Sequence, residues 1–387
     1  MIPLCADSES ADIWMSPIGT PGAAKRSLYL ALRHAQIPVD VVNEEDCSRG
    51  SLNHYAVLFI VDPQVSEEAV SAIGTWATSG GHVFVTAGGA QLSEANQTNV
   101  AMQKLQAGIT QTGIWTGTRY SRHNGARHRP LAAAGSFANA SLLRVVAATI
   151  FFVKQELPFA ETLDEVTVLA TQTSPAATLG VFGEKSIINF DPPASAKPGV
   201  DYNISAVFED SSPASIAIAV GSGVLHYAAY HPGLSYMQPA MPRRPVDRTA
   251  HLDGYTHFVP TEFDAGARDM LARAVAAAGG SGTAPRCSDP LVEVGHISSP
   301  AGTLLPLINW NTPGNQTSYW KRDNYTRVTV DLSAVTPAPK FATATLASCG
   351  VLTPPACAAK QGGVVRLNAS GLVLSVDVAL ADAIILR

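Results

Sequence analysis

The chain has 387 residues, a length that is typical of two domains of ordinary size. Apolar residues make up 46% and charged residues 15%, which indicates a globular protein with a sizeable core. A formal net charge of -5 excludes a global attraction to nucleic acid or to anionic membranes, and no apolar run approaches the roughly 20 residues of a membrane-spanning helix.

The first part of the chain alternates strand and helix signals. Apolar runs of strand length occur at residues 13–18, 39–42, 55–61 and 82–86. Apolar residues at helical spacing predict a helix over 21–35, and a second helix is expected between Ser66, a capping residue, and the Gly80-Gly81 pair. Strands and helices in this succession predict a parallel sheet with right-handed crossovers.

The pattern is less regular in the middle of the chain. We expect a helix over 142–154 and a basic loop over 119–129, which is either a surface loop or an anion-binding loop. Strand signals resume at 166–170, 186–190 and 204–208. A glycine-rich turn between the runs 216–220 and 224–230 predicts a hairpin, and an Ala-rich helix is expected over 264–278.

A Gly-Gly-Ser-Gly-Thr-Ala-Pro stretch over residues 279–285 marks the expected domain boundary. The two predicted domains are 8–280, an α/β domain, and 286–387. Short runs of strand period fill the second domain, which predicts a small antiparallel β-sandwich. The expected strands are 291–296, 303–310, 326–332, 340–346, 363–367, 372–378 and 383–386.

The residues at the ends of two strands indicate a known arrangement of catalytic residues. The strand over 82–86 leads into Ala87-Gly88-Gly89, and the strand over 224–230 leads into His231-Pro232-Gly233. The sequence resembles the class I glutamine amidotransferases over about residues 10–280. In that family a Cys nucleophile stands on a sharp turn after a strand, adjacent N–H groups form an oxyanion hole, and a His-Pro-Glu motif supplies the base. The resemblance implies a flavodoxin-like parallel sheet with helices on both faces.

The chain departs from that family at both strand ends. Thr86, Ala87 and Gly88 occupy the elbow, which therefore lacks a Cys or Ser nucleophile, and Gly233 stands where the family has the Glu that orients the His. We expect no glutaminase activity, because both a nucleophile and an oriented base are required. Thr86 as a replacement nucleophile is the alternative to a buried Thr that bonds its own backbone.

A second resemblance covers most of the chain. The run from Tyr55 through Asp62-Pro63, the capped helix and the segment over 80–86 look like the trimerisation domain of family-42 beta-galactosidases, and the segment ending at Arg387 looks like their C-terminal β domain. A weaker resemblance is to the ThuA-like trehalose-utilisation proteins. The first resemblance implies a non-catalytic assembly or scaffold module of a carbohydrate-active protein, a pseudoenzyme that forms homo-oligomers, specifically trimers. Any glycoside hydrolase activity is expected to come from another domain or subunit.

Two other functions stay open. A stand-alone hydrolase would place its site at the carboxyl ends of the parallel strands, with His231, Asp62 and Tyr236 as candidate catalytic residues. A carbohydrate-binding module would stack sugars on Trp310 and Trp320, for which packing in the core of the sandwich is the competing interpretation. No spacing of Cys or His predicts a metal site and no phosphate loop is present, so we expect neither a metal nor another cofactor.

The compartment is indicated by sequons and cysteines. The first residues carry no signal peptide, yet an excess of N-glycosylation sequons favours a secreted or extracytoplasmic protein. Cys349 and Cys357 bracket a Pro-Pro turn and are a candidate disulfide, and the odd total of five cysteines leaves at least one thiol unpaired. The sequon asparagines are Asn96, Asn139, Asn203, Asn315, Asn324 and Asn368.

Overall fold

A computed structural model describes the fold. The described residues are 4–7, 20–106, 109–116, 162–171, 175–190, 202–240, 263–279, 284–310, 326–335, 341, 343–348, 365–367, 372–378 and 381–387. Several sequence-based expectations lie outside these residues: the strand over 13–18, the basic loop over 119–129, the helix over 142–154, Trp320, the pairing of Cys349 with Cys357, and the sequon residues Asn139, Asn315, Asn324 and Asn368.

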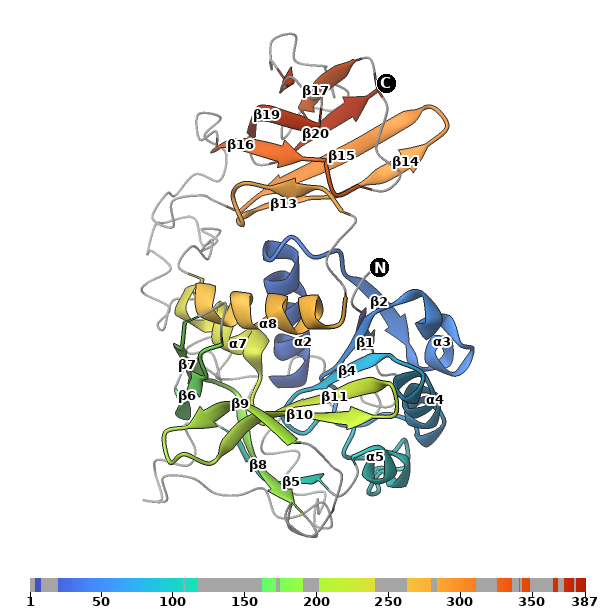
Figure 1. Cartoon of the computed structure of the whole chain (residues 1–387), viewed down its shortest axis with the longest axis vertical. Helices are drawn as coiled ribbons and strands as arrows, with labels where there is room; N and C mark the ends of the chain where they lie inside the picture. Colours follow the sequence, from blue (N-terminus) through green and yellow to red (C-terminus); the bar gives the residue numbers. More distant parts are fainter. Residues whose placement is uncertain are drawn as a thin grey trace, which may run out of the picture.

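In the described part of the chain, one sheet of nine strands frames the larger unit (Figure 1). Five neighbouring strands run parallel to one another. In spatial order they are β2 (Asp40–Asn43), β1 (Leu4–Asp7), β3 (Val57–Ile60), β4 (His82–Val85) and β11 (Gly223–Ala228). The sequence predicted β2, β3, β4 and β11, whereas β1 lies before residue 8, the expected start of the first domain.

The other four strands run antiparallel, so the sheet is mixed and the expectation of a parallel sheet holds for one half only. The change of direction occurs at the predicted hairpin, where Val220 pairs with Gly223 and Gly221 adopts a φ of 61°. A connection this short can join antiparallel strands only. The four strands, in spatial order from β11, are β10 (Pro213–Val220), β9 (Tyr202–Phe208), β6 (Asp164–Val168) and β7 (Ala177–Val181).

Helices pack in two groups (Figure 1). One group contains α2 (Thr20–His34), α7 (Pro232–Met237) and α8 (Ala265–Ala277), and it lies on the side of the sheet that faces the C-terminal strands. The other group contains α4 (Glu67–Thr78) and α5 (Val100–Leu105). None of the helices in the described ranges is both long and apolar enough to cross a membrane.

Side chains cap α4 and α8 at their first turns, and the sequence analysis predicted the cap of α4. The Ser66 hydroxyl accepts the N–H of Ala69 at 3.3 Å at the start of α4, and Asp264 accepts the N–H of Ala267 at 2.9 Å at the start of α8. The elements that the sequence analysis did not predict are short or weakly patterned. They are α3 (Glu44–Ser48), α5, α7, the 3-10 turns η1 (Ser51–His54) and η4 (Gln238–Ala240), and the strands β1, β5 (Ile109–Thr116), β7, β12 (Arg286–Cys287) and β14 (Ile297–Ser299).

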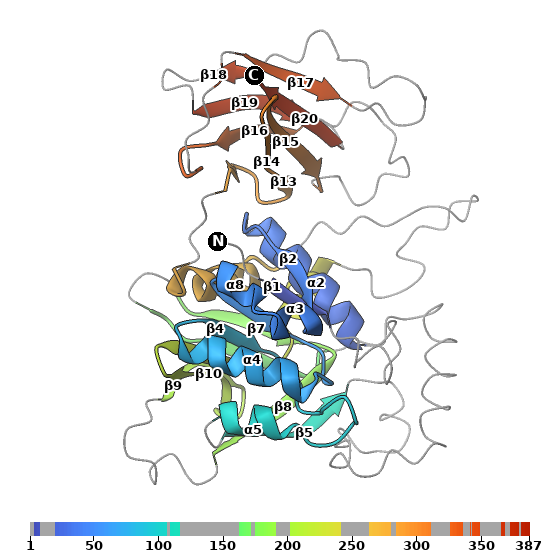
Figure 2. The ribbon, with the colours of Figure 1, turned by 90° about the vertical axis from the view of Figure 1, so that its right-hand side faces the viewer.

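The C-terminal part consists of strands, and it lies at the opposite end of the molecule from β5 and α5 (Figure 2). Its two sheets share one hydrophobic core, and the α/β part has a separate core. The first sheet contains β12 (Arg286–Cys287), β16 (Thr326–Asp331), β19 (Val373–Val378) and β18 (Arg366–Leu367). The second contains β13 (Val292–Val294), β15 (Gly302–Asn309), β20 (Ala381–Leu386) and β17 (Ala344–Ser348), with β14 (Ile297–Ser299) paired to β15.

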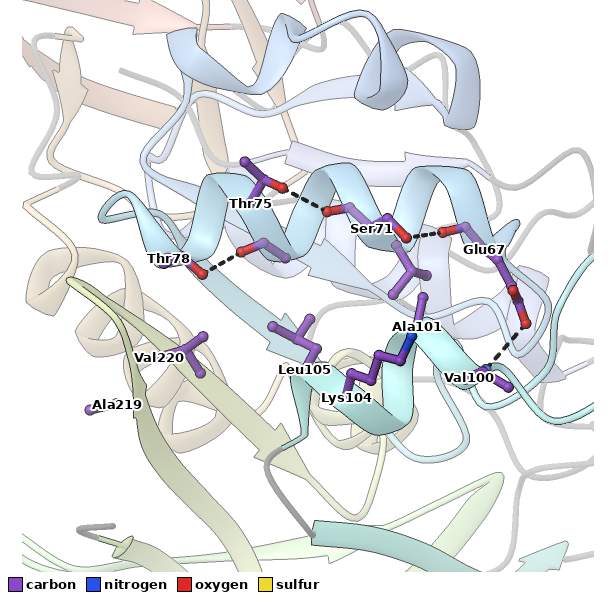
Figure 3. Close-up of a pocket in the computed structure, with 12 residues that line it drawn as sticks. Glu67, Ser71, Thr75, Thr78, Val100, Ala101, Lys104, Leu105, Ala219 and Val220 are labelled. Atoms are coloured by element: carbon purple, nitrogen blue, oxygen red, sulfur yellow. Dashed lines mark hydrogen bonds between the residues drawn. The ribbon is translucent and has the colours of Figure 1, made fainter. Parts of the chain in front are cut away.

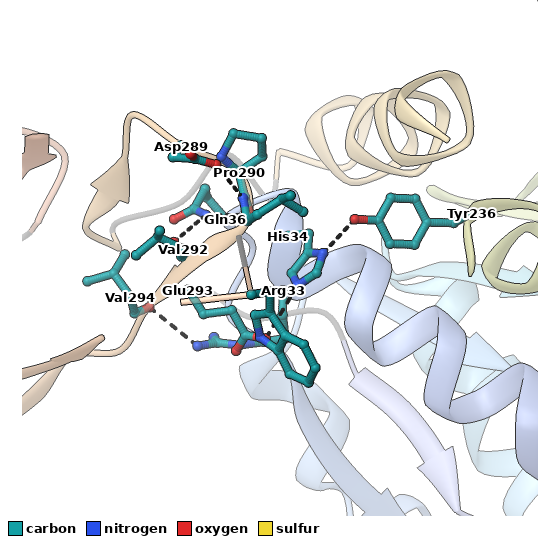
Figure 4. Close-up of polar contacts among 11 residues, drawn as sticks. Arg33, His34, Gln36, Tyr236, Asp289, Pro290, Val292, Glu293 and Val294 are labelled. Carbon is teal, nitrogen blue, oxygen red and sulfur yellow. Dashed lines mark hydrogen bonds and ion pairs between the residues drawn. The ribbon is translucent and has the colours of Figure 1, made fainter. Parts of the chain in front are cut away.

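A buried polar cluster joins the two parts at the end of α2 (Figure 4). Glu293 of β13 is 7% exposed and accepts hydrogen bonds from Arg33 Nε at 3.2 Å and from the Trp310 indole at 2.8 Å. Gln36 donates to the carbonyl of Val292 at 3.1 Å and accepts the N–H of Cys287 at 3.1 Å. A carboxylate this deeply buried is tolerated only when it is paired, so the contact depends on both sides being in place.

Candidate functional site

The elbow after β4 is a tight, buried turn. Gly88 and Ala90 adopt φ values of 72° and 51°, and an added Cβ on Gly89 would lie 2.9 Å from the carbonyl oxygen of Ile60. The glycines are therefore required by left-handed backbone and by close approach to β3. Thr86 and Ala87 at the start of the turn are each 1% exposed.

The backbone N–H groups of the elbow are engaged within the protein. Ala87 donates to the Tyr230 carbonyl at 3.4 Å, Gly89 to the Thr86 carbonyl at 2.9 Å, and Ala90 to the Asp62 carbonyl at 2.8 Å. The remaining N–H, that of Gly88, donates to a side-chain oxygen of Gln111 at 2.8 Å. An oxyanion hole needs N–H donors that face the reacting group, and in this turn those donors are already occupied.

His231 lies between β11 and α7 and is 1% exposed. Its Nδ1 is 3.2 Å from the Thr86 hydroxyl, and its Nε2 is 3.3 Å from Oε2 of Glu184. A carboxylate only accepts hydrogen bonds, so Nε2 is the donor in the contact with Glu184. The Thr86 hydroxyl also lies 3.5 Å from the Ile60 carbonyl oxygen, to which it donates. Thr86, His231 and Glu184 therefore form a hydrogen-bonded row of hydroxyl, imidazole and carboxylate.

Sequence reasoning placed the orienting carboxylate at position 233 and considered it lost. The structure gives a different source, Glu184 at the start of β8 (Glu184–Phe190). Position 233 could not hold a Glu, because even a Cβ there would lie 2.4 Å from the Leu28 backbone nitrogen of α2. The expectation that the orienting role is vacant is therefore corrected. No sequence signal links Glu184 to His231, since the two residues meet only through the packing of β8 against the main sheet.

The other two candidate catalytic residues have partners of their own. Asp62, after β3, is buried and pairs with Lys25 of α2 at 2.9 Å. The Tyr236 hydroxyl lies 2.5 Å from Nδ1 of His34, on the side toward the C-terminal part (Figure 4). Burial raises the pKa of Tyr236 and lowers the pKa of His34 to about 3, so Tyr236 is the donor and His34 is neutral.

Trp310, a candidate sugar-stacking residue, lies in the contact between the two parts. Its indole N–H is engaged by Glu293, and its ring meets His34 edge-on with 5.7 Å between ring centroids. Trp310 also packs against the core of the α/β part. This placement differs from the competing interpretation, which was packing in the core of the C-terminal sandwich. Sugar binding by Trp310 and Trp320 stays a prediction.

A surface groove of about 470 Å³ lies between α4 and α5 (Figure 3). Three hydroxyls of α4 line it, but each donates to the carbonyl four residues earlier: Ser71 to Glu67, Thr75 to Ser71, and Thr78 to Gly74. None of the candidate catalytic residues is among the groove's lining residues. The groove is therefore separate from the elbow.

A stacked pair of imidazoles gives a prediction about pH. His82 and His226 lie 3.3 Å apart, from Nδ1 to Nε2, and burial followed by the charge of His82 lowers the pKa of His226 to about 4. The unfolded chain, with a His pKa near 6.5, thus binds more protons than the folded protein as pH falls from about 6.5 to about 4, and stability is lost in that window. We expect His226→Gln to reduce the loss of unfolding free energy between pH 7 and pH 5 by about 2 kcal/mol.

Denaturant unfolding at the two pH values measures this effect. The exposed His54, replaced by Gln, is the matched control and should leave the pH dependence as it is in the wild type. An unchanged pH dependence in His226→Gln would contradict the assignment of a neutral, half-buried imidazole to this position.

Comparisons with known proteins identify related folds. No protein-family model and no curated protein sequence matches the chain. Its fold is similar to beta-galactosidase from Bacillus circulans sp. alkalophilus (TM-score 0.54, 12% identity), to the cold-adapted enzyme from Rahnella sp. R3 (0.53, 13%), and to Gan42B, a GH42 beta-galactosidase from G. stearothermophilus (0.50, 12%). Each match covers 100% of this chain and 40% or 41% of the other chain.

These similarities support the resemblance to family-42 beta-galactosidases that the sequence indicated. At 12% and 13% identity they show a shared fold. The chain spans about two fifths of the length of the structures that it matches.

Proposed function

We propose that this chain is a non-catalytic assembly module of a carbohydrate-active, beta-galactosidase-like protein. The observation that carries the proposal is the extent of the structural similarity. The whole chain matches a portion of beta-galactosidases that makes up 40% or 41% of their length. The sequence resemblance is to the trimerisation domain and the C-terminal β domain of that family, so we expect the chemistry to be performed by another portion.

The finer fold assignments are part of the same proposal. The five parallel strands have the order 2-1-3-4-5 when they are numbered along the chain, which is the flavodoxin-like order. This order supports an amidotransferase-like α/β unit, the counterpart of the trimerisation domain. Two hydrophobic cores with no residue in common support a division into two domains near residues 279–285, with the C-terminal sheets as a β-sandwich.

The buried elbow is consistent with a framework role. A substrate carbonyl that is attacked at Thr86 would need N–H donors for the developing oxyanion, and the N–H groups from Ala87 to Ala90 already have acceptors inside the protein. The imidazole of His231 is engaged on both of its nitrogens. These contacts favour a hydrogen-bonded frame that holds β4, β8 and β11 together.

Assembly is tested by light scattering on the full chain. We expect a mass of three chains that persists on dilution, because the resemblance implies a trimer formed through the α/β domain. Ile297 on β14 is 56% exposed, and Ile297→Lys is the matched control that should leave the trimer intact. Charged substitutions at exposed apolar residues of the α/β unit, such as Val41 and Val100, are the scan for the interface. A monomer at every concentration would contradict the assembly role.

The row formed by Thr86, His231 and Glu184 favours a second candidate function, a stand-alone hydrolase. A hydroxyl, an imidazole and a carboxylate in this order are the parts of an activated nucleophile. The two functions differ in one observable: turnover that depends on His231. A scaffold has none, whereas a hydrolase loses its activity when the imidazole is removed.

A further inference from the structure

The side chain of Gln111 lies against the elbow and is held at both ends of its carboxamide. Its Oε1 accepts the Gly88 N–H at 2.8 Å and the Ser186 hydroxyl at 2.8 Å. Its Nε2 donates to the Thr86 carbonyl at 3.4 Å. Gln111 is 8% exposed and Ser186 is fully buried, so these bonds form in a place where an unpaired polar group would be costly.

The three partners recognise one functional group. Two donors converge on a single oxygen, and one carbonyl faces the adjacent nitrogen. A primary carboxamide satisfies all three, since it has an acceptor oxygen and a donor NH₂ on the same carbon. A carboxylate would place an acceptor against the Thr86 carbonyl, and an ester or tertiary amide would bring no N–H to it. The arrangement therefore discriminates among groups of similar size.

The recognising groups belong to a fixed frame, and Gln111 does not. The elbow follows β4 in the main sheet. Strand β8 is attached to that sheet by backbone contacts: the Ser186 N–H donates to the Ala229 carbonyl at 2.8 Å, and Lys185 forms an isolated β-bridge with Tyr230. Gln111 stands on β5, which pairs with β8 in a separate two-stranded sheet. The frame thus remains in place if the side chain of Gln111 is removed.

We infer that the elbow is a binding site for a primary carboxamide and that Gln111 is its built-in occupant. Truncation at position 111 then leaves a cavity with two donors that lack a partner, beside the Thr86 carbonyl, which still accepts the Gly89 N–H and has a second lone pair. A small carboxamide fills this cavity. This inference does not depend on the assembly role, because it concerns one buried site and is tested on that site alone.

The test uses the full chain with acetamide as the probe. Gln111→Ala is expected to lower the midpoint of thermal unfolding by about 5 °C, because it leaves buried partners unpaired. Added acetamide should raise the midpoint of Gln111→Ala more than that of the wild type. N,N-dimethylacetamide and acetate should give no such difference, because the first has no N–H and the second is a carboxylate.

Gln64→Ala is the matched control variant. Gln64 is also a buried glutamine, and its amide donates to Asn96 at 3.2 Å, outside the elbow. Acetamide should not raise the unfolding midpoint of this variant more than that of the wild type. Equal shifts in Gln111→Ala, Gln64→Ala and the wild type would overturn the inference, as would rescue by dimethylacetamide that equals rescue by acetamide.

A second variant keeps the inference testable if Gln111→Ala does not fold. Gln111→Glu has nearly the same shape but turns a carboxylate oxygen toward the Thr86 carbonyl. We expect its unfolding midpoint at neutral pH to fall below that of the wild type by several degrees, about as far as one buried hydrogen bond is worth. A Gln111→Glu protein as stable as the wild type would contradict the recognition of a carboxamide.

Discussion

Gly233→Ala is expected to lower the free energy of unfolding by about 3 kcal/mol, the upper end of what overpacking costs. The added Cβ would lie 2.4 Å from the backbone nitrogen and 2.6 Å from the Cα of Leu28. Both atoms belong to the backbone of α2, so no side chain can rotate away, and α7 must separate from α2. Denaturant unfolding of the purified variant measures the loss.

Gly74→Ala is the matched control for this prediction. Gly74 lies inside α4, and its added Cβ would be 3.7 Å from a Leu105 methyl group, an ordinary contact. Alanine is preferred over glycine within a helix by roughly 1 kcal/mol, so the control should be neutral or stabilising. A Gly233→Ala protein as stable as Gly74→Ala would show that α7 and α2 are not as close as described. It would also mean that position 233 has room for the Glu of the amidotransferase motif.

Glu293→Ala should cost about 3 kcal/mol of unfolding free energy, because it removes one partner from a buried charge pair and leaves the other in place. The Arg33 guanidinium and the Trp310 indole would both lose the same acceptor. These residues come from α2 and from the C-terminal part, so the contact between the two parts is weakened as well. We expect the two parts to separate in limited proteolysis, with new cleavage near residues 279–285.

The exposed pair Glu45 and Arg49 provides the control for this substitution. Their side chains are 62% and 67% exposed, and such surface pairs contribute little because water screens them. Glu45→Ala should therefore change the stability by less than about 0.5 kcal/mol. If Glu293→Ala lowers the unfolding free energy no more than Glu45→Ala does, the result would contradict a buried, paired contact between the two parts.

Local signals in the sequence were sufficient for the regular parts of the fold. The buried runs of β3 and β4 and the cap at Ser66 depend on neighbouring residues, and the structure has them where the sequence predicted them. The direction of the four strands that lie beyond β11 in the sheet was harder to predict from the sequence. The hairpin was predicted, but its consequence for the whole second half of the sheet depends on which strands pair over long distances.

The contacts of the elbow could not be derived from sequence, because each joins segments that are far apart in the chain. Glu184 and Gln111 carry no motif, and they reach His231 and Gly88 only because β8 and β5 pack beside the elbow. In the sequence, Gly233 stands where the amidotransferase motif has a Glu. The structure shows that a glycine is required there because the backbone of Leu28 in α2 lies so close. Trp310 is similar, since its contact with His34 depends on how the two parts meet.

The central claim, that the elbow is a frame and not a catalytic site, is tested most directly by turnover in matched variants. Glutamine, an activated ester and a chromogenic galactoside are offered to the wild type, to His231→Gln and to Thr86→Val, which keeps the shape of Thr86 without its hydroxyl. The account predicts background rates that are the same in all three proteins. Turnover by the wild type that is lost in both variants, while both remain folded, would contradict it.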